Sequence, residues 1–258
     1  MKMDTIKLDL VEVPEGKFIM GANMDTDVAA EEDEEPKRQI WLSTYQIQRT
    51  PVTIDLWVQF LQSTAYHWSF HKEIEQKSDG KSYPITYVTW FDAYELTKWL
   101  SEVTGDRYAL PTEAQWEKAC RGECGQLYPW GNEEPEDWYE MPPVSTTLLP
   151  VGVRLDRQSP YGCLDMWQNI AEWCLDWYDE ERYDSGETYY QNDLTKTINP
   201  TGPEIGEFKV WRGGIDEYQS SGWPRCSLRG FQKPYFYHDR LGFRVVLNLE
   251  FLKSNIQN

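Results

Sequence analysis

The chain has 258 residues, of which 40% are hydrophobic and 15% aromatic, and this apolar content excludes a chain that is disordered throughout. With 43 acidic and 25 basic residues its formal net charge is −18, so we expect neither nucleic acid nor an anionic membrane as a partner. No apolar run approaches the roughly 18 residues of a membrane span. Because five cysteines at irregular spacing do not suggest a disulfide framework, we expect a cytoplasmic protein with reduced thiols.

The first part of the chain alternates between apolar and polar residues, as short strands do. This pattern predicts two strands within Lys7–Gly21, joined at Pro14–Gly16, and one further strand within Trp41–Thr53. Thr53 is then a suitable N-cap for a helix over Ile54–Ala65.

Two more helices follow, each with a clear end signal. The first covers Phe91–Gly105 and is closed by its glycine. The second covers Pro111–Gly122 and begins with Thr112 and Gln115 in a capping-box arrangement. The apolar side chains expected on the inner faces of these helices are Ala93, Leu96, Leu100, Val103, Trp116 and Ala119.

After Gly122 the chain is rich in turn residues, prolines and isolated aromatic residues. The strand-like pieces there are short, such as Phe208–Gly214 and Leu241–Leu249, and Ile215–Pro224 between them follows neither a helix nor a strand period. The sequence therefore predicts a mixed α+β class with a loop-rich C-terminal half. The acidic run Ala29–Lys37 is typical of a solvated loop, with a divalent-cation site as the alternative.

Nine short motifs occur in one order along nearly the whole chain. They lie at Phe18–Gly21, Thr50–Thr53, Pro84–Leu100, Tyr108–Gly122, Tyr128–Asn132, Tyr161–Trp173, Trp211–Gly214, Arg225–Arg229 and Leu241–Val246. Together they resemble the formylglycine-generating enzyme (sulfatase-modifying factor) family. The resemblance implies one C-type-lectin-like domain over residues 1–258, with little regular secondary structure. It does not imply an activity, because one fold can carry several functions.

The copper-dependent oxidases of this family need two thiols between the Arg-Gly-Gly and Arg-Cys motifs, because Cu(I) prefers soft thiolate ligands. Here that interval, Ile215–Pro224, contains no cysteine, and Cys226 matches a cysteine that is usually structural. We therefore expect no copper and no formylglycine-generating activity. A metal-dependent oxidoreductase, of this type or of the non-haem iron type, is the alternative function.

Iron would require the three histidines of the chain, His67, His71 and His238. If residues 67–71 were helical, His67 and His71 would share one face, with Glu73 close by. The iron enzymes of the family, however, take their ligands from a preceding helical domain. We therefore favour surface histidines.

The resemblance also implies one calcium site. In the matching family loop, Asp165 and Glu172 would supply side-chain oxygens, and Gln168 and Ile170 main-chain carbonyls, as suits a hard cation. Gln168 stands where the family usually has glycine, so its backbone angle would be strained. The alternative is that Glu172 pairs with an arginine.

With catalysis disfavoured, the irregular interval is a candidate binding surface for a protein or small-molecule ligand. Arg212, Arg225, Arg229 and Arg244 are expected to brace its surroundings, and the residues between them mix rigid aromatic and adaptable polar groups, as antibody paratopes do. The family includes variable proteins of diversity-generating retroelements, whose changeable positions occupy this interval, and inactive pseudoenzyme subunits. The expected ligand-binding residues are Asp216, Glu217, Tyr218, Gln219, Trp223, Phe231, Tyr235, Phe236, Tyr237 and His238.

Overall fold

Segments from both ends of the chain meet in one antiparallel sheet. The computed structural model describes residues 6–27, 29–70, 82–134, 148–178, 197–214 and 225–248. In this sheet β1 (Leu10–Val13) pairs with β4 (Tyr45–Gln48), β4 pairs with β10 (Val246–Asn248), and β10 pairs with β5 (Tyr108–Ala109). The last described strand therefore holds elements of the N-terminal half together.

A two-stranded hairpin of β2 (Gly16–Met20) and β3 (Arg38–Leu42) carries the acidic run between its strands. The two strands predicted before Gly21 are confirmed, although β1 and β2 pair in different sheets. The prediction of a single strand within residues 41–53 is wrong, because the chain forms the end of β3, is interrupted at Ser43–Thr44 and continues as β4, which pairs in another sheet.

The third sheet has the strand order β8 (Arg229–Gln232), β7 (Lys209–Gly214), β6 (Gln168–Trp177) and β9 (Leu241–Gly242). β6 is antiparallel to β7 and parallel to β9. The predicted strand over β7 is confirmed. The continuous strand predicted over Leu241–Leu249 is instead divided into β9 and β10, with the fully buried Arg244 between them.

The three predicted helices are confirmed as α1 (Ile54–Ser63), α3 (Trp90–Thr104) and α4 (Glu113–Arg121). Thr53 caps α1, and Thr112 forms the expected capping box with Gln115 at the start of α4.

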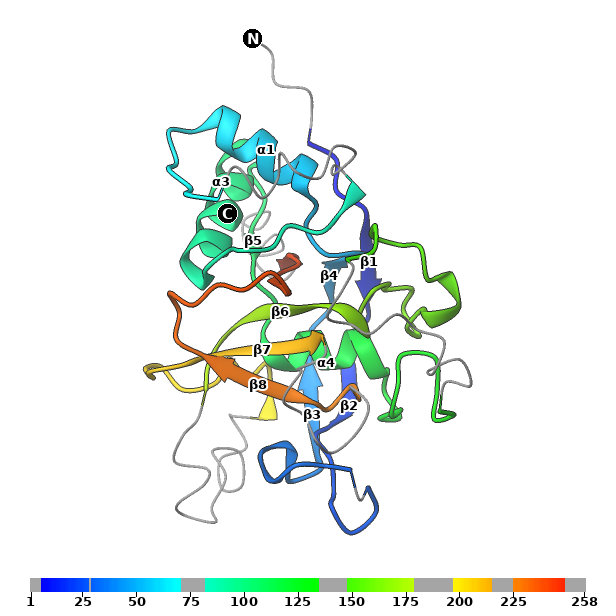
Figure 1. Cartoon of the computed structure of the whole chain (residues 1–258). Helices are drawn as coiled ribbons and strands as arrows, with labels where there is room; N and C mark the ends of the chain where they lie inside the picture. The colour runs from blue at the N-terminus through cyan, green and yellow to red at the C-terminus, as the bar shows by residue number, and fades with distance from the viewer. Residues whose placement is uncertain are drawn as a thin grey trace, which may run out of the picture.

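Gly105 ends α3 in the left-handed conformation, at φ 81°, that glycine adopts without strain. The predicted inner face of α3 is buried at Ala93, Leu96 and Leu100, but Val103 in the last turn is 40% exposed, so its assignment to the core is wrong. Figure 1 shows α1 and α3 at one end of the molecule and the β2–β3 hairpin at the other, with β6, β7, β8 and α4 between them.

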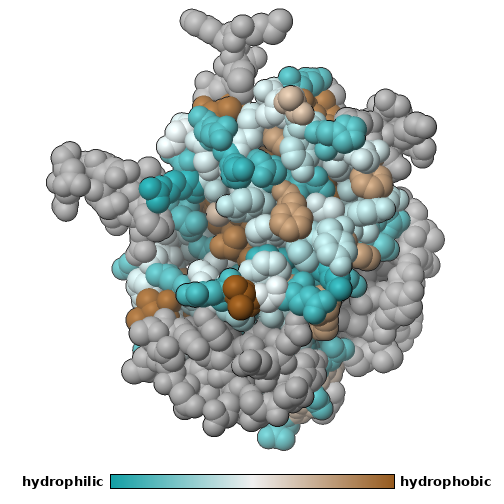
Figure 2. Space-filling model, turned by 90° about the vertical axis from the view of Figure 1, so that its left-hand side faces the viewer, coloured by the Kyte–Doolittle hydropathy of each residue, from teal (hydrophilic) through white to brown (hydrophobic). Residues whose placement is uncertain are grey.

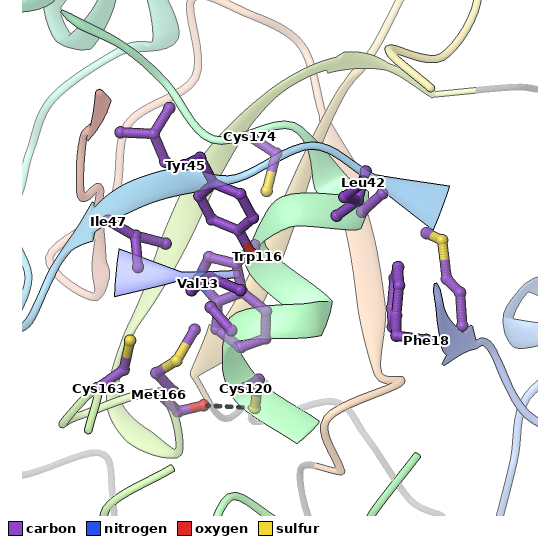
Figure 3. Packing of buried hydrophobic residues seen from close by; sticks show 14 of the residues in the cluster. Val13, Phe18, Leu42, Tyr45, Ile47, Trp116, Cys120, Cys163, Met166 and Cys174 are labelled. Carbon is purple, nitrogen blue, oxygen red and sulfur yellow. Dashed lines mark hydrogen bonds between the residues drawn. The ribbon is translucent and has the colours of Figure 1, made fainter. Parts of the chain in front are cut away.

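Two hydrophobic clusters flank β6. Successive side chains of a strand point to opposite faces, and accordingly Trp173 belongs to one cluster and Cys174 to the other. Figure 3 shows the cluster around Trp116 of α4, which packs against side chains of the N-terminal strands. The other cluster combines aliphatic and aromatic side chains, and the ring centroid of Trp57 in it lies 5.0 Å from that of Phe60.

The described residues thus form an α+β fold with short strands and long connections, as the sequence predicts. Among them, no helix combines the length and the apolar character needed to cross a membrane.

Candidate functional site

Arg212 lies near the end of β7, where the chain enters Ile215–Pro224, a segment outside the described residues. Its fully buried guanidinium donates to the Glu117 carboxylate and to the carbonyl oxygens of Ser227 (2.6 Å) and Leu228 (2.9 Å). A charge-assisted contact and two main-chain contacts fix the direction in which the chain enters the segment.

Gly214, the last residue of β7, brings its backbone unusually close to β6. A Cβ there would lie 2.7 Å from the main-chain nitrogen of Ala171, and the residue has φ 73°. Only glycine meets both conditions without strain, so the entry to the segment is rigidly specified.

Arg225 holds the other end of the segment. Its guanidinium contacts the carboxylates of Asp27 at 2.7 Å and Glu34 at 2.9 Å. The side chains of Arg225 and Glu34 are 4% and 0% exposed. The interpretation of the acidic run as a solvated loop is therefore wrong for Glu34, which neutralises an arginine of the C-terminal half.

Two further arginines make two-point ion pairs in the interior. Arg229 contacts Glu113 at 2.6 and 2.8 Å, and Arg244 contacts Glu172 at 2.6 and 2.7 Å. Burial by itself lowers the pKa of a guanidinium, but the carboxylates more than offset this, so the pKa of both arginines lies above the ordinary value. The expected bracing role of the four arginines is confirmed; we call Arg212, Arg225, Arg229 and Arg244 with their carboxylates the arginine frame.

The residues expected to bind calcium do not fit that ion in this arrangement. Both oxygens of Glu172 contact Arg244, and one of them also accepts the indole N–H of Trp116 at 3.0 Å. The Asp165 carboxylate accepts the main-chain N–H of Gly152 at 2.6 Å. A Ca²⁺ ion at Glu172 would have to displace a guanidinium that already neutralises the carboxylate.

From Gln168 onward the backbone of this region is strand, with an irregularity between Gln168 and Ala171. Gln168 and Ile170 belong to β6, and the positive φ expected at Gln168 falls on Asn169, at 58°. Asparagine tolerates this conformation, and its side chain bonds the main chain of Leu149 at 3.0 and 3.1 Å. Burial raises the pKa of Asp165.

Two of the three histidines considered for iron, His67 and His238, lie within the described residues. His67 is exposed beyond the end of α1 and is not helical, and His71 is outside the described residues. His238 is exposed and its Nδ1 lies 3.1 Å from the carboxylate of Asp239. In the described ranges no three His, Cys, Asp or Glu side chains gather closely enough to hold a metal ion.

Two thiols lie beside the arginine frame. The Sγ atoms of Cys120 and Cys226 are 2.6 Å apart, and both residues are buried. Burial raises the pKa of the Cys120 thiol well above its ordinary value. A reactive thiol needs the opposite shift, so Cys120 has the character of an interior residue, and Cys226 is buried beside it.

β8 and the chain between β8 and β9 expose part of the predicted binding surface. Phe231 is 38% exposed, Tyr235 61% and Tyr237 45%, His238 is exposed, and Phe236 is half-buried. This chain runs along the left of Figure 1, the side that faces the viewer in Figure 2, where apolar residues form separate patches among hydrophilic ones. Five other predicted residues lie outside the described ranges: Asp216, Glu217, Tyr218, Gln219 and Trp223.

Two exposed aromatic residues beside this surface were not predicted. Phe91 is 49% and Tyr94 39% exposed, and both contact Trp90 of α3. The main-chain N–H of Trp90 bonds the carbonyl oxygen of Pro234 at 3.0 Å, which joins α3 to the β8–β9 connection. Their position three residues apart, opposite the inner face of α3, is the sequence signal that could have revealed them.

Comparison with known proteins gives one family over almost the whole chain. Residues 4–249 match the sulfatase-modifying factor enzyme 1-like domain. The formylglycine-generating enzyme of Thermomonospora curvata is 29% identical over 80% of this chain and 81% of that enzyme. The serine/threonine-protein kinase pkn1 of Chlamydia caviae is 28% identical over 95% of this chain, which spans only 39% of the kinase.

Two solved structures share the fold. PvdO from Pseudomonas aeruginosa has a TM-score of 0.67 at 21% identity, covering 93% of this chain and 94% of that one. Treponema denticola variable protein 1 has a TM-score of 0.69 at 19% identity, covering 96% and 97%. The predicted formylglycine-generating-enzyme-like, C-type-lectin-like fold is thus confirmed.

Proposed function

Because the chain belongs to the family of sulfatase-modifying factor enzyme 1-like domains, we propose that it uses this fold as a scaffold for binding a protein or small-molecule ligand. The ligand would contact Ile215–Pro224 together with the exposed residues of Phe231–His238. The observation that carries this proposal is the arginine frame, which fixes both ends of a segment that has no strand or helix period.

With the arginine frame in place, we expect the stability of the fold to be largely independent of the sequence of Ile215–Pro224. Arg212 is held by α4 and by the chain after Arg225, and Arg225 is held by the β2–β3 connection. These contacts reach residues outside Ile215–Pro224. Residues within the segment can therefore change while its ends stay in place, which is the arrangement that a binding surface with adaptable loops requires.

A finer proposal is that the segment is diversified genetically, as in a variable protein. The shared fold with Treponema denticola variable protein 1 supports it. A near-identical repeat of the coding region beside a reverse-transcriptase gene, differing only at adenines, would be the expected genomic sign. A genome without such a repeat would leave a binding module with one fixed surface.

The binding proposal is tested with a library in which the codons of Asp216–Gln219 and Trp223 are randomised. We expect most members to remain protease-resistant, and members that bind a chosen test protein, such as lysozyme, to be recovered by display.

The matched control randomises Glu113, Glu117, Glu34 and Arg225 of the frame. We expect it to abolish protease resistance, because unpaired buried charges are strongly destabilising. If randomising the segment unfolds most members, the segment is part of the core and the proposal is wrong.

A further inference from the structure

An aromatic cluster of Phe70, Tyr87 and Tyr237 lies at the edge of the proposed binding surface. The ring centroid of Phe70 lies 5.6 Å from that of Tyr87, in a stacked arrangement, and 4.5 Å from that of Tyr237. Tyr237 is 45% exposed, and the neighbouring Tyr235 is 61% exposed. The cluster therefore joins half-buried rings to rings that face solvent.

The backbone beneath this cluster adopts a costly conformation. Tyr87 has φ 59°, whereas the other non-glycine residues with positive φ in the described ranges are aspartate and asparagine, which tolerate it. The β8–β9 connection holds Tyr87 in place, because its N–H bonds the carbonyl oxygen of His238 at 3.0 Å. Backbone strain of this kind persists where the surroundings enforce it, and it concentrates at binding sites.

The charge of the molecule indicates what such a cluster would bind. The arginines of the frame are neutralised in the interior by Glu34, Glu113, Glu117 and Glu172, so these pairs contribute nothing to the surface charge. The excess of 18 negative charges is therefore borne by the rest of the chain.

Two lysines of the described residues, one on α3 and one on the β8–β9 connection, are also paired with carboxylates. Lys233 contacts Glu207 and Lys98 contacts Glu95, each at 2.9 Å. Asp239, next to the cluster, has a side chain that is 51% exposed. A cation approaching the rings from solvent thus meets the negative field of the molecule as a whole.

We propose that the cluster of Phe70, Tyr87 and Tyr237 receives a lysine or arginine side chain from a basic segment of a partner protein. Aromatic ring faces attract such cations, and the surface charge steers a basic partner toward them. This inference rests on the proposed binding function and names the class of its partner.

The test uses a fluorescently labelled 12-residue peptide of alternating arginine and glycine, with a glutamate–glycine peptide as its counterpart. Fluorescence polarisation should show binding of the arginine peptide only, and weaker binding at higher salt. Tyr237→Phe keeps the ring face and should bind as the unchanged protein does. Tyr237→Leu keeps apolar area but loses the ring face, and should bind roughly 2- to 30-fold more weakly.

Two further variants keep the test decisive. Leu155→Ala alters a residue that is 69% exposed in the short 3-10 helix Leu155–Arg157 and should leave binding unchanged. Tyr87→Asn suits the left-handed backbone but removes a ring, and should weaken binding even if Tyr237→Leu fails to fold.

If the arginine peptide binds the unchanged protein, Tyr237→Leu and Tyr87→Asn equally, general surface charge explains the binding and the cluster proposal is overturned. It is also overturned if the arginine peptide does not bind. The library experiment is independent of both results, so the scaffold function can stand while the partner class fails.

Discussion

Four buried glutamates neutralise the four arginines of the arginine frame. Glu34, Glu113, Glu117 and Glu172 are each at most 3% exposed, and each neutralises a guanidinium that the chain brings in from the C-terminal half. A buried ion pair adds little net stability over apolar packing, but removing one partner leaves the other charge unpaired. The frame is therefore sensitive to single substitutions and specific in geometry.

Arg225→Ala tests this sensitivity. We expect a loss of roughly 3–5 kcal/mol in the free energy of unfolding, because the substitution leaves the buried Glu34 carboxylate without its cation. Chemical denaturation monitored by tryptophan fluorescence measures it. Arg154→Ala is the matched control, since Arg154 pairs with a 60% exposed Asp156, and it should cost at most about 1 kcal/mol. Equal losses of unfolding free energy in the two variants would contradict the stabilising role of the buried ion pair between Arg225 and Glu34.

Asp176 gives the protein a distinct dependence on pH. Burial, and next the Glu113 carboxylate, raise the pKa of Asp176 from 3.8 to about 7. The folded state thus prefers the neutral acid, so this contribution to stability is complete below pH 3.8 and is lost as the pH rises through 7.

We compare the free energy of unfolding of Asp176→Asn with that of the unchanged protein. As the pH is raised from 5 to 8, this difference should therefore change by roughly 3 kcal/mol in favour of Asp176→Asn. Urea denaturation at several pH values measures the difference. Asp156→Asn should show no such trend over this range, because a hydrogen bond from Arg154 lowers the pKa of Asp156 below 3.8 and its contribution to stability changes only at more acidic pH. A difference between Asp176→Asn and the unchanged protein that is constant with pH would refute the burial argument.

At the scale of elements, local chemistry predicts helices well and sheet partners poorly. The caps at Thr53, Thr112 and Gly105 depend on neighbouring residues and are confirmed. β6 was missed, because Gln168–Trp177 contains no alternation and is buried on both faces between two clusters. Strand pairing links segments distant in the chain, and the sequence of one segment carries no signal for it.

The predicted calcium loop includes Gln168 and Ile170, which belong to the strand β6. Since Arg244 occupies both oxygens of Glu172, we expect neither EDTA nor millimolar calcium to shift the melting temperature of the protein. Glu172→Gln should cost roughly 3–5 kcal/mol with or without calcium, because it leaves Arg244 buried and unpaired. A calcium-dependent rise in the melting temperature that Glu172→Gln abolishes would restore the ion site.

At the scale of the whole molecule, motif order predicts the family and the fold, and composition predicts little of the site. Phe231, in β8, and Tyr235 and Tyr237, in the chain between β8 and β9, are exposed as a binding surface requires. Phe91 and Tyr94 were missed because a helix period identifies the buried face and leaves the use of the outer face open. Glu34 was misjudged because its partner, Arg225, is 191 residues away.

For the molecule as a whole, membership of the family does not imply the oxidase activity found in the family. The chain matches the family over residues 4–249, yet Ile215–Pro224 has no cysteine, and copper-dependent oxidation of a cysteine needs soft thiolate ligands. We expect no aldehyde product when the protein is incubated with a sulfatase-type cysteine peptide, copper, dioxygen and a reductant. Mass spectrometry against a no-protein sample measures it, with the Thermomonospora curvata enzyme as positive control. An aldehyde formed above background would mean that another set of residues holds the metal, and the scaffold interpretation would have to give way to an enzymatic one.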